Sequence, residues 1–121
     1  MIPTYNRPDM ARQAVLQMAV QTRRPDAICV HQNGNAESYE WCIADLRSLA
    51  NIIWVHTPEK IKQNDWYAVP LKVLLDAGCT HFFWVDHDDI YARTHIETVM
   101  EELRVFDFSI CLLYTSDAAD E

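Results

Sequence analysis

Hydrophobic positions follow two different spacings along the chain, and the two alternate. Short apolar runs, of the kind found in buried strands, lie at 1–3, 27–30, 52–55 and 82–85. Stretches with apolar residues at helical spacing begin near positions 8, 36, 70 and 94. This order of strand and helix predicts an α/β fold, with a mostly parallel sheet and helices on both of its faces.

Each predicted helix has an apolar face, and most have a recognisable end. Pro8 suits the first helical position, and we expect the first helix to end before Arg23. The third helix should begin near Pro70 and stop at Gly78. Thr94-His95-Ile96-Glu97 has the form of a capping box that opens the fourth. The residues expected on inner faces are Ala11, Ala14, Val15, Met18 and Ala19 in the first helix, and Tyr39, Cys42, Ile43, Leu46 and Leu49 in a second helix over 36–50.

The C-terminal end departs from this pattern. Positions 106–110 are expected to form a further strand, whereas 111–121 look like translated read-through from a sequencing adaptor. We therefore interpret 1–110 as one domain and 111–121 as a non-native tail. The alternative is a genuine strand that continues to Tyr114.

Composition narrows the class of protein. Half of the 121 residues are hydrophobic and 23% are charged, as is typical of a globular chain. The net charge of -8 argues against a nucleic-acid-binding protein. No apolar run approaches the ~20 residues of a transmembrane helix. The four cysteines are widely spaced, so we expect reduced thiols and a cytoplasmic location, with membrane association left open for a longer parent protein.

Three carboxylates are gathered directly after the apolar run 82–85. They belong to Asp86, Asp88 and Asp89, with His87 among them. Neighbouring carboxylates repel one another, and a divalent cation such as Mg²⁺, which binds one or two carboxylates together with substrate phosphates, would relieve the repulsion. A solvated acidic loop, or a set of helix caps, is the alternative. His87 is a further candidate ligand, or it points away from the acids.

Two other loops should lie at the same edge of the sheet as this acidic segment. Positions 3–7 and 31–35 follow the first two predicted strands, and 86–89 follow the last. In a parallel sheet, ligands bind outside the carboxyl ends of the strands. The three loops together carry an arginine, amide side chains and carboxylates, which suits a nucleoside diphosphate with its cation.

The three loop sequences resemble those of the family 2 glycosyltransferases. The matching segments are Ile2-Pro3-Thr4-Tyr5-Asn6-Arg7, Val30-His31-Gln32-Asn33-Gly34-Asn35 and Trp84-Val85-Asp86-His87-Asp88-Asp89. The resemblance covers nearly all of 1–110. It implies a Rossmann-like GT-A fold, of which this chain would be the N-terminal, nucleotide-sugar-binding half.

The resemblance also implies roles for particular residues. Pro3, Thr4, Tyr5 and Arg7 would line the nucleotide, with Arg7 near the diphosphate. Asp86 and Asp88 match the Asp-x-Asp motif and would bind Mn²⁺ or Mg²⁺, with Asp86 also facing the ribose or sugar. Gln32 stands where the family commonly has an aspartate that holds the base or ribose, and Asn33 is a second candidate there.

The implied activity is transfer of a sugar from its nucleoside diphosphate to an acceptor hydroxyl of a glycan, a lipid or another molecule. The general base lies downstream of the matched region in this family, so we name no catalytic residue and expect this chain to be inactive alone. A Mg²⁺-dependent phosphotransfer domain and a non-catalytic nucleotide-binding module are the alternatives. Trp66 and Tyr67 are interpreted as packing residues, with an approach to the donor as the alternative. Lys60 and Lys62 are interpreted as solvated residues, with a contact to phosphate as the alternative.

Overall fold

A computed structural model describes residues 1–62 and 65–109 of the chain. Its centre is a parallel sheet with the strand order β1 (Ile2–Thr4), β2 (Ile28–Asn33) and β3 (Ile52–Thr57). Ile2 pairs with Val30, and Val30 pairs with Trp54, so the three strands run in register across the sheet. The predicted α/β class and parallel sheet are confirmed.

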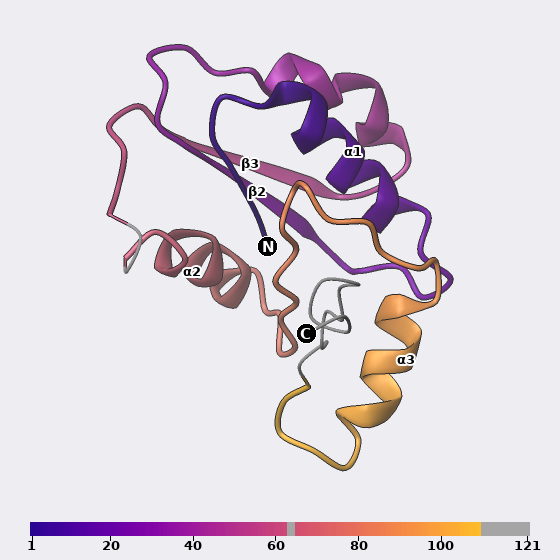
Figure 1. The fold of residues 1–121 in the computed structure, drawn as a ribbon. Coiled ribbons are helices and arrows are strands. Elements are labelled where there is room, and N and C mark those ends of the chain that lie inside the picture. The colour runs from indigo at the N-terminus through magenta and orange to yellow at the C-terminus, as the bar shows by residue number, and fades with distance from the viewer. Residues whose placement is uncertain (63–64, 110–121) are drawn as a thin grey trace, which may run out of the picture.

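Helices cover both faces of this sheet. The α-helix α1 (Pro8–Ala19) and the 3₁₀-helix η1 (Glu40–Ser48) pack together on one face, and α2 (Ala68–Asp76) lies on the other (Figure 1). The last helix, α3 (His95–Glu102), follows the acidic segment. None of these helices in the described part of the chain is long and apolar enough to span a membrane.

The fit of α1 to the sheet follows from its sequence. Pro8 occupies the start of the helix, where its missing N–H costs nothing. All five residues predicted to face inward are buried, namely Ala11, Ala14, Val15, Met18 and Ala19. Three of them are alanines, so the helix backbone lies close to the strands. The helix ends at Ala19, a little earlier than the position before Arg23 at which we expected it to end.

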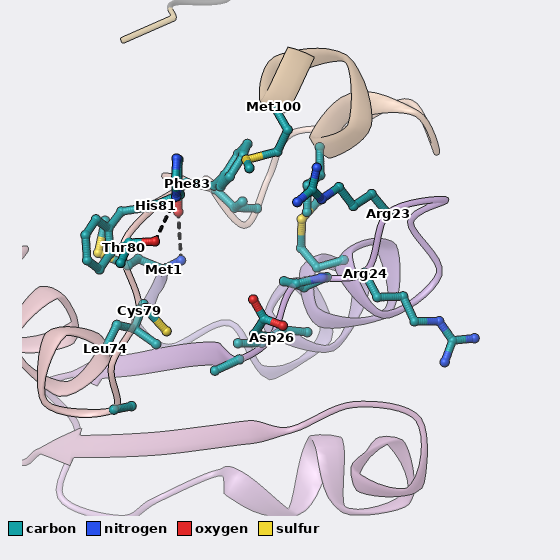
Figure 2. Close-up of a pocket in the computed structure, with 18 of the residues that line it drawn as sticks. Met1, Arg23, Arg24, Asp26, Leu74, Cys79, Thr80, His81, Phe83 and Met100 are labelled. Carbon is teal, nitrogen blue, oxygen red and sulfur yellow. Dashed lines mark hydrogen bonds between the residues drawn. The ribbon is translucent and has the colours of Figure 1, made fainter. Parts of the chain in front are cut away.

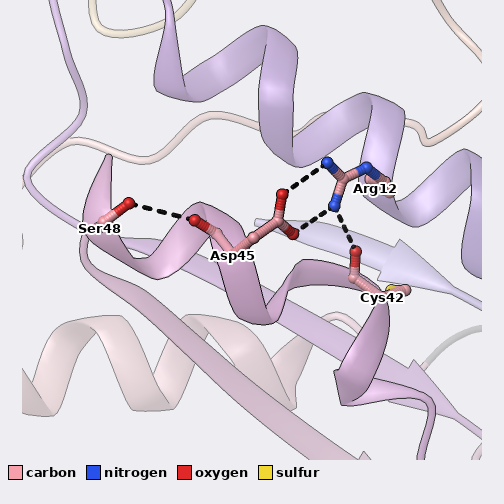
Figure 3. Close-up of polar contacts among 4 residues, drawn as sticks. All are labelled: Arg12, Cys42, Asp45 and Ser48. Carbon is pink, nitrogen blue, oxygen red and sulfur yellow. Dashed lines mark hydrogen bonds and ion pairs between the residues drawn. The ribbon is translucent and has the colours of Figure 1, made fainter.

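A forked ion pair joins α1 to η1 (Figure 3). The Nη1 and Nη2 atoms of Arg12 donate to the two carboxylate oxygens of Asp45 at 2.5 and 2.8 Å, and Nη1 also donates to the carbonyl of Cys42 at 2.9 Å. Arg12 holds the pKa of the Asp45 carboxyl below its ordinary value by this hydrogen bond. The Arg12 side chain is 42% exposed and that of Asp45 is 64% exposed, so the pair orients the two helices more than it stabilises them.

The second helix differs from the prediction in type and in extent. It is a 3₁₀-helix over Glu40–Ser48, whereas an α-helix over 36–50 was expected. Gln32 explains the late start, because its side chain accepts a hydrogen bond from the Tyr39 amide and donates one to the Glu37 carbonyl. These bonds hold 37–39 outside the helix. Cys42, Ile43 and Leu46 are buried as predicted, but Leu49 is exposed.

Two of the strands predicted from the sequence, the one at 82–85 and the one that begins at 106, do not form in the described part of the chain. The segment 82–85 lies beside the start of β1, where the Met1 amine donates to the Phe83 carbonyl and the Val85 amide to the Met1 carbonyl. Since β1 begins only at Ile2, these two bonds make one rung of a parallel ladder rather than a strand. Residues 106–109 have no strand partner there, and Ile110 and the predicted tail 111–121 lie outside the described residues.

The third helix begins and ends close to the predicted positions, and the fourth begins where predicted. Gly78 follows α2 with a φ of 88°, as expected for a glycine that ends a helix. Thr94 precedes α3 as predicted, but it makes no side-chain capping bond. Glu97, the other half of the expected capping box, instead accepts a hydrogen bond from the Thr22 hydroxyl at 3.0 Å. A tertiary contact has therefore replaced the local one.

Two glutamines fasten the segment after the acidic loop to α1. Gln17 donates to the Asp89 carbonyl at 3.1 Å and accepts from the Tyr91 amide at 2.7 Å. Gln21, which is 3% exposed, donates to the Ala92 carbonyl at 2.8 Å and accepts from the Ile96 amide at 3.0 Å. Each side-chain amide thus replaces backbone partners that a neighbouring strand would provide.

We expect Gln21→Ala to lower the free energy of unfolding by about 1–3 kcal/mol, because a buried amide and carbonyl lose their partners. Gln13→Ala, at an exposed position of α1, is the matched control and should change stability little. Urea denaturation of the two variants measures the difference. Equal urea midpoints would show that the hydrogen bonds of the Gln21 side chain do not contribute to the free energy of unfolding.

Candidate functional site

A pocket of about 300 Å³ lies at the carboxyl edge of the sheet. Pro3, Thr4 and Tyr5 line it from the end of β1, and 86–88 line it from the acidic segment. The segment after β3 contributes 60–61, and Trp66 enters from the turn before α2. Asn33 lines it from the end of β2. Five separate described parts of the chain therefore meet in one cavity, at the edge where a parallel sheet binds ligands.

Most of the predicted binding residues meet in this pocket. Those that line it are Pro3, Thr4, Tyr5, Asn33, Asp86 and Asp88. Arg7 does not line it, because it lies at the N-terminal boundary of α1 with an exposed side chain. Gln32 is not part of the lining either. It is fully buried, and its amide is used by the bonds to 37 and 39 described above.

Asn33 helps to build the wall of the pocket. Its side chain accepts a hydrogen bond from the Ile61 amide at 2.8 Å and donates to the Ile61 carbonyl at 3.0 Å. The amide group therefore binds the segment after β3 much as a neighbouring strand would. This contact fixes Ile61, and with it Lys60, at the edge of the pocket.

Tyr5, Gly34 and Lys60 form a tight cluster that joins the three loops. A Cβ atom on Gly34 would lie 2.8 Å from the Tyr5 ring and 3.6 Å from the Lys60 Cβ, so the ring rests against the glycine backbone. Gly34 also has a φ of 107°, which other residues rarely adopt. The Lys60 ammonium lies 4.0 Å from the centre of the Tyr5 ring, within the range of a cation–π contact.

The acidic loop is shaped by its own aromatic residues. Trp84 Nε1 donates to the Asp86 carboxylate at 3.0 Å, and the Asp86 amide donates to the Tyr91 hydroxyl at 3.1 Å. Trp84 also packs edge-on against Trp66, with 5.0 Å between the ring centres. Trp84, before the loop, and Tyr91, after it, thus both bind Asp86. The side chains of Asp86 and Asp88 remain exposed.

The pocket residues can bind a metal ion only if a bound ligand supplies additional coordinating atoms. The described residues contain no group of three or more His, Cys, Asp or Glu side chains placed to hold an ion. Asp86 and Asp88 supply two carboxylates, which matches the way Mg²⁺ is held between one or two carboxylates and substrate phosphates. His87 Nδ1 is buried without a hydrogen-bond partner in the described structure, but the histidine does not form a three-ligand group with the two carboxylates.

Ile61 is a pocket residue that sequence reasoning missed, and Lys60 and Trp66 are two for which it gave a ligand contact only as the alternative. Lys60 was interpreted as solvated and Trp66 as a packing residue, yet both line the cavity. Trp66 reaches it because α2 starts at Ala68 and carries the preceding turn over the sheet edge. Only their position after a predicted strand could have pointed to them, and that signal is weak.

A larger cavity, of about 440 Å³, lies elsewhere on the molecule (Figure 2). Its polar residues include Arg23, Arg24 and Asp26 from the loop before β2, and Thr80 and His81 from the segment after α2. None of the residues predicted to bind a nucleotide or metal lines it. We therefore take the smaller pocket as the candidate site, because it contains predicted nucleotide- and metal-binding side chains and the larger cavity does not.

No protein-family model matches this chain, and no curated protein matches it. The candidate site consequently stands on the residues and their geometry.

His31 is a buried titratable group in the central strand. Its side chain is 0% exposed, and its Nε2 shares a hydrogen bond with the Thr57 hydroxyl at 2.9 Å. Burial lowers the pKa of His31 below its ordinary value of 6.5, because desolvation disfavours the charged imidazolium. Burial lowers the pKa of His95 in the same way.

The free energy of unfolding should therefore decrease as the pH drops below about 6.5. In that range His31 becomes protonated in the unfolded protein, whereas in the folded protein its lowered pKa keeps it neutral. The loss should continue until the pH reaches the lowered pKa of the folded protein. Denaturation midpoints at about pH 7.5 and about pH 5.5 measure it. In His31→Gln the decrease should be smaller than in the wild type, and an equal decrease would exclude His31 as its source.

We expect Gly34→Ala to destabilise the fold by about 2–4 kcal/mol, since left-handed backbone strain adds to overpacking against Tyr5. Gly78→Ala is the matched control, because Gly78 has a φ of 88° but open space around it. It should cost only the strain, about 1–2 kcal/mol. Thermal unfolding compares the two, and a larger effect at Gly78 would contradict the packing argument.

Proposed function

We propose that this chain is the nucleotide-sugar-binding part of a family 2 glycosyltransferase domain of the GT-A type. Its pocket at the carboxyl edge would bind the nucleoside diphosphate of the donor together with Mn²⁺ or Mg²⁺. The observation that supports this most is the meeting of Tyr5, Asp86 and Asp88 in one cavity, although Asp86 lies 81 positions after Tyr5 in the chain.

The parts of the pocket suit the parts of such a ligand. Tyr5 has a half-exposed ring, and Trp66 adds a second aromatic surface, so a planar base has apolar faces to contact. The exposed carboxylates of Asp86 and Asp88 would hold the cation beside the diphosphate. When bound, the cation would offset the negative charge of the departing diphosphate. The volume of about 300 Å³ lies at the lower end of the range for small-molecule sites.

The acceptor side of the reaction is not represented among these residues. Transfer needs a general base for the acceptor hydroxyl, and the resemblance puts that group downstream of the matched segments. We therefore assign to this chain the binding of donor and cation, and assign transfer to an acceptor hydroxyl to the longer enzyme.

Thermal unfolding with uridine, guanosine or adenosine diphosphate and Mn²⁺ tests the proposal. A ligand present at about 100 times its Kd adds about 2.7 kcal/mol of stability, which for a chain of this size raises Tm by roughly 10 °C. We expect one of the three nucleotides to produce such a rise, and expect the rise to need Mn²⁺.

Two substitutions separate specific binding from a general effect of charge. Asp88→Asn should lose the Mn²⁺-dependent part of the rise. Asp107→Asn makes the same change of charge at an exposed position outside the pocket and should keep it. If no nucleotide raises Tm, or if both variants respond like the wild type, the proposed function is wrong.

A further inference from the structure

Lys60 holds its ammonium group over Tyr5, and both side chains line the pocket. The contact measures 4.0 Å from Nζ to the ring centre. At an exposed site a cation–π contact of this kind is weak, and Tyr5 is 46% exposed. The Lys60 ammonium is therefore positioned by a weak contact with the ring. A group that binds the ammonium more strongly than the ring does can replace that contact.

The charges of the pocket require such a cation. Among the described residues that line it, Asp86 and Asp88 carry negative charge, and Lys60 is the only lysine or arginine. A diphosphate that enters adds negative charge beside the two carboxylates. A divalent cation balances the carboxylates, and a second positive group is needed on the other side of the phosphates.

Arg7 does not supply that second charge in this structure. The resemblance assigned it to the diphosphate, but it lies at the boundary of α1 and is not part of the lining. Lys60, in contrast, is fixed at the pocket by its neighbour Ile61, whose backbone is bound by Asn33 through two hydrogen bonds.

We infer that Lys60 is the phosphate-binding cation of this pocket. It rests on the Tyr5 ring while no ligand is bound and moves to a phosphate oxygen when a nucleoside diphosphate enters. The ring face that the ammonium leaves then becomes available to the base. The inference rests on the proposed function and names the residue that binds the phosphates of its ligand.

Calorimetric titration of wild type and Lys60→Met with uridine diphosphate, inorganic pyrophosphate and uridine, all with Mn²⁺, tests it. Methionine keeps the apolar stem and removes the charge. Affinity for uridine diphosphate and pyrophosphate should fall about tenfold, as for the loss of a charged hydrogen bond. Affinity for uridine, which has no phosphate, should stay the same or rise, because the ring is uncovered. A purely structural role of Lys60 would weaken all three.

Arg7→Met and Lys72→Met are the matched controls. Lys72 is an exposed residue of α2 paired with Asp76, so its loss changes net charge without changing the pocket. Both controls should bind uridine diphosphate as the wild type does. Unchanged binding in Lys60→Met, or a tenfold loss in Arg7→Met instead, overturns the inference alone. A wild type that binds neither pyrophosphate nor any of the three nucleoside diphosphates overturns the proposed function, and the inference with it.

Discussion

The packing of α1 against β1 and β2 is the interaction on which the rest of the described structure depends. Its small apolar residues, such as Ala11 and Ala14, bring the helix close to the strands, and burial of Val15 and Met18 adds about 1.5–3 kcal/mol each. The same helix then serves other contacts with its polar residues. One edge meets η1 through an ion pair, and Gln17 near its C-terminal end, together with Gln21 just after the helix, binds backbone groups between 89 and 96.

The pocket follows from this arrangement because the strands are parallel. Parallel strands bring all their carboxyl ends to one edge, so segments that are distant in the chain arrive together. Much of the polar chemistry at that edge serves the fold. Gln32 and Asn33 use their amides on backbone groups of neighbouring loops. Among the described residues, the side chains left for a ligand are the carboxylates of the acidic loop, the rings of Tyr5 and Trp66, and one lysine.

Some polar side chains at this edge stabilise the fold, and others remain available to a ligand. The type of a residue therefore does not by itself show whether it binds a ligand here. An amide beside a predicted binding loop looks suited to a nucleotide, yet a buried amide must first satisfy its own hydrogen bonds. Gln32 does so inside the protein and is fully buried. Lys60 was interpreted as a solvated residue, but the hydrogen bonds between Asn33 and Ile61 hold its backbone at the pocket.

The sequence by itself determined the α/β class, the inner face of α1 and the starts and stops marked by Pro8 and Gly78. These features depend on periodicity and on steric limits within a few residues, which any chain of this sequence carries. It also indicated that the loops after β1 and β2 and the acidic segment lie at one edge. Only the tertiary structure decided that Gln32 is buried, that Lys60 and Trp66 line the pocket, and that 82–85 pairs by a single rung. Each of these depends on contacts between segments that are distant in the chain or lie in different elements. Local sequence patterns do not determine which of these segments come into contact.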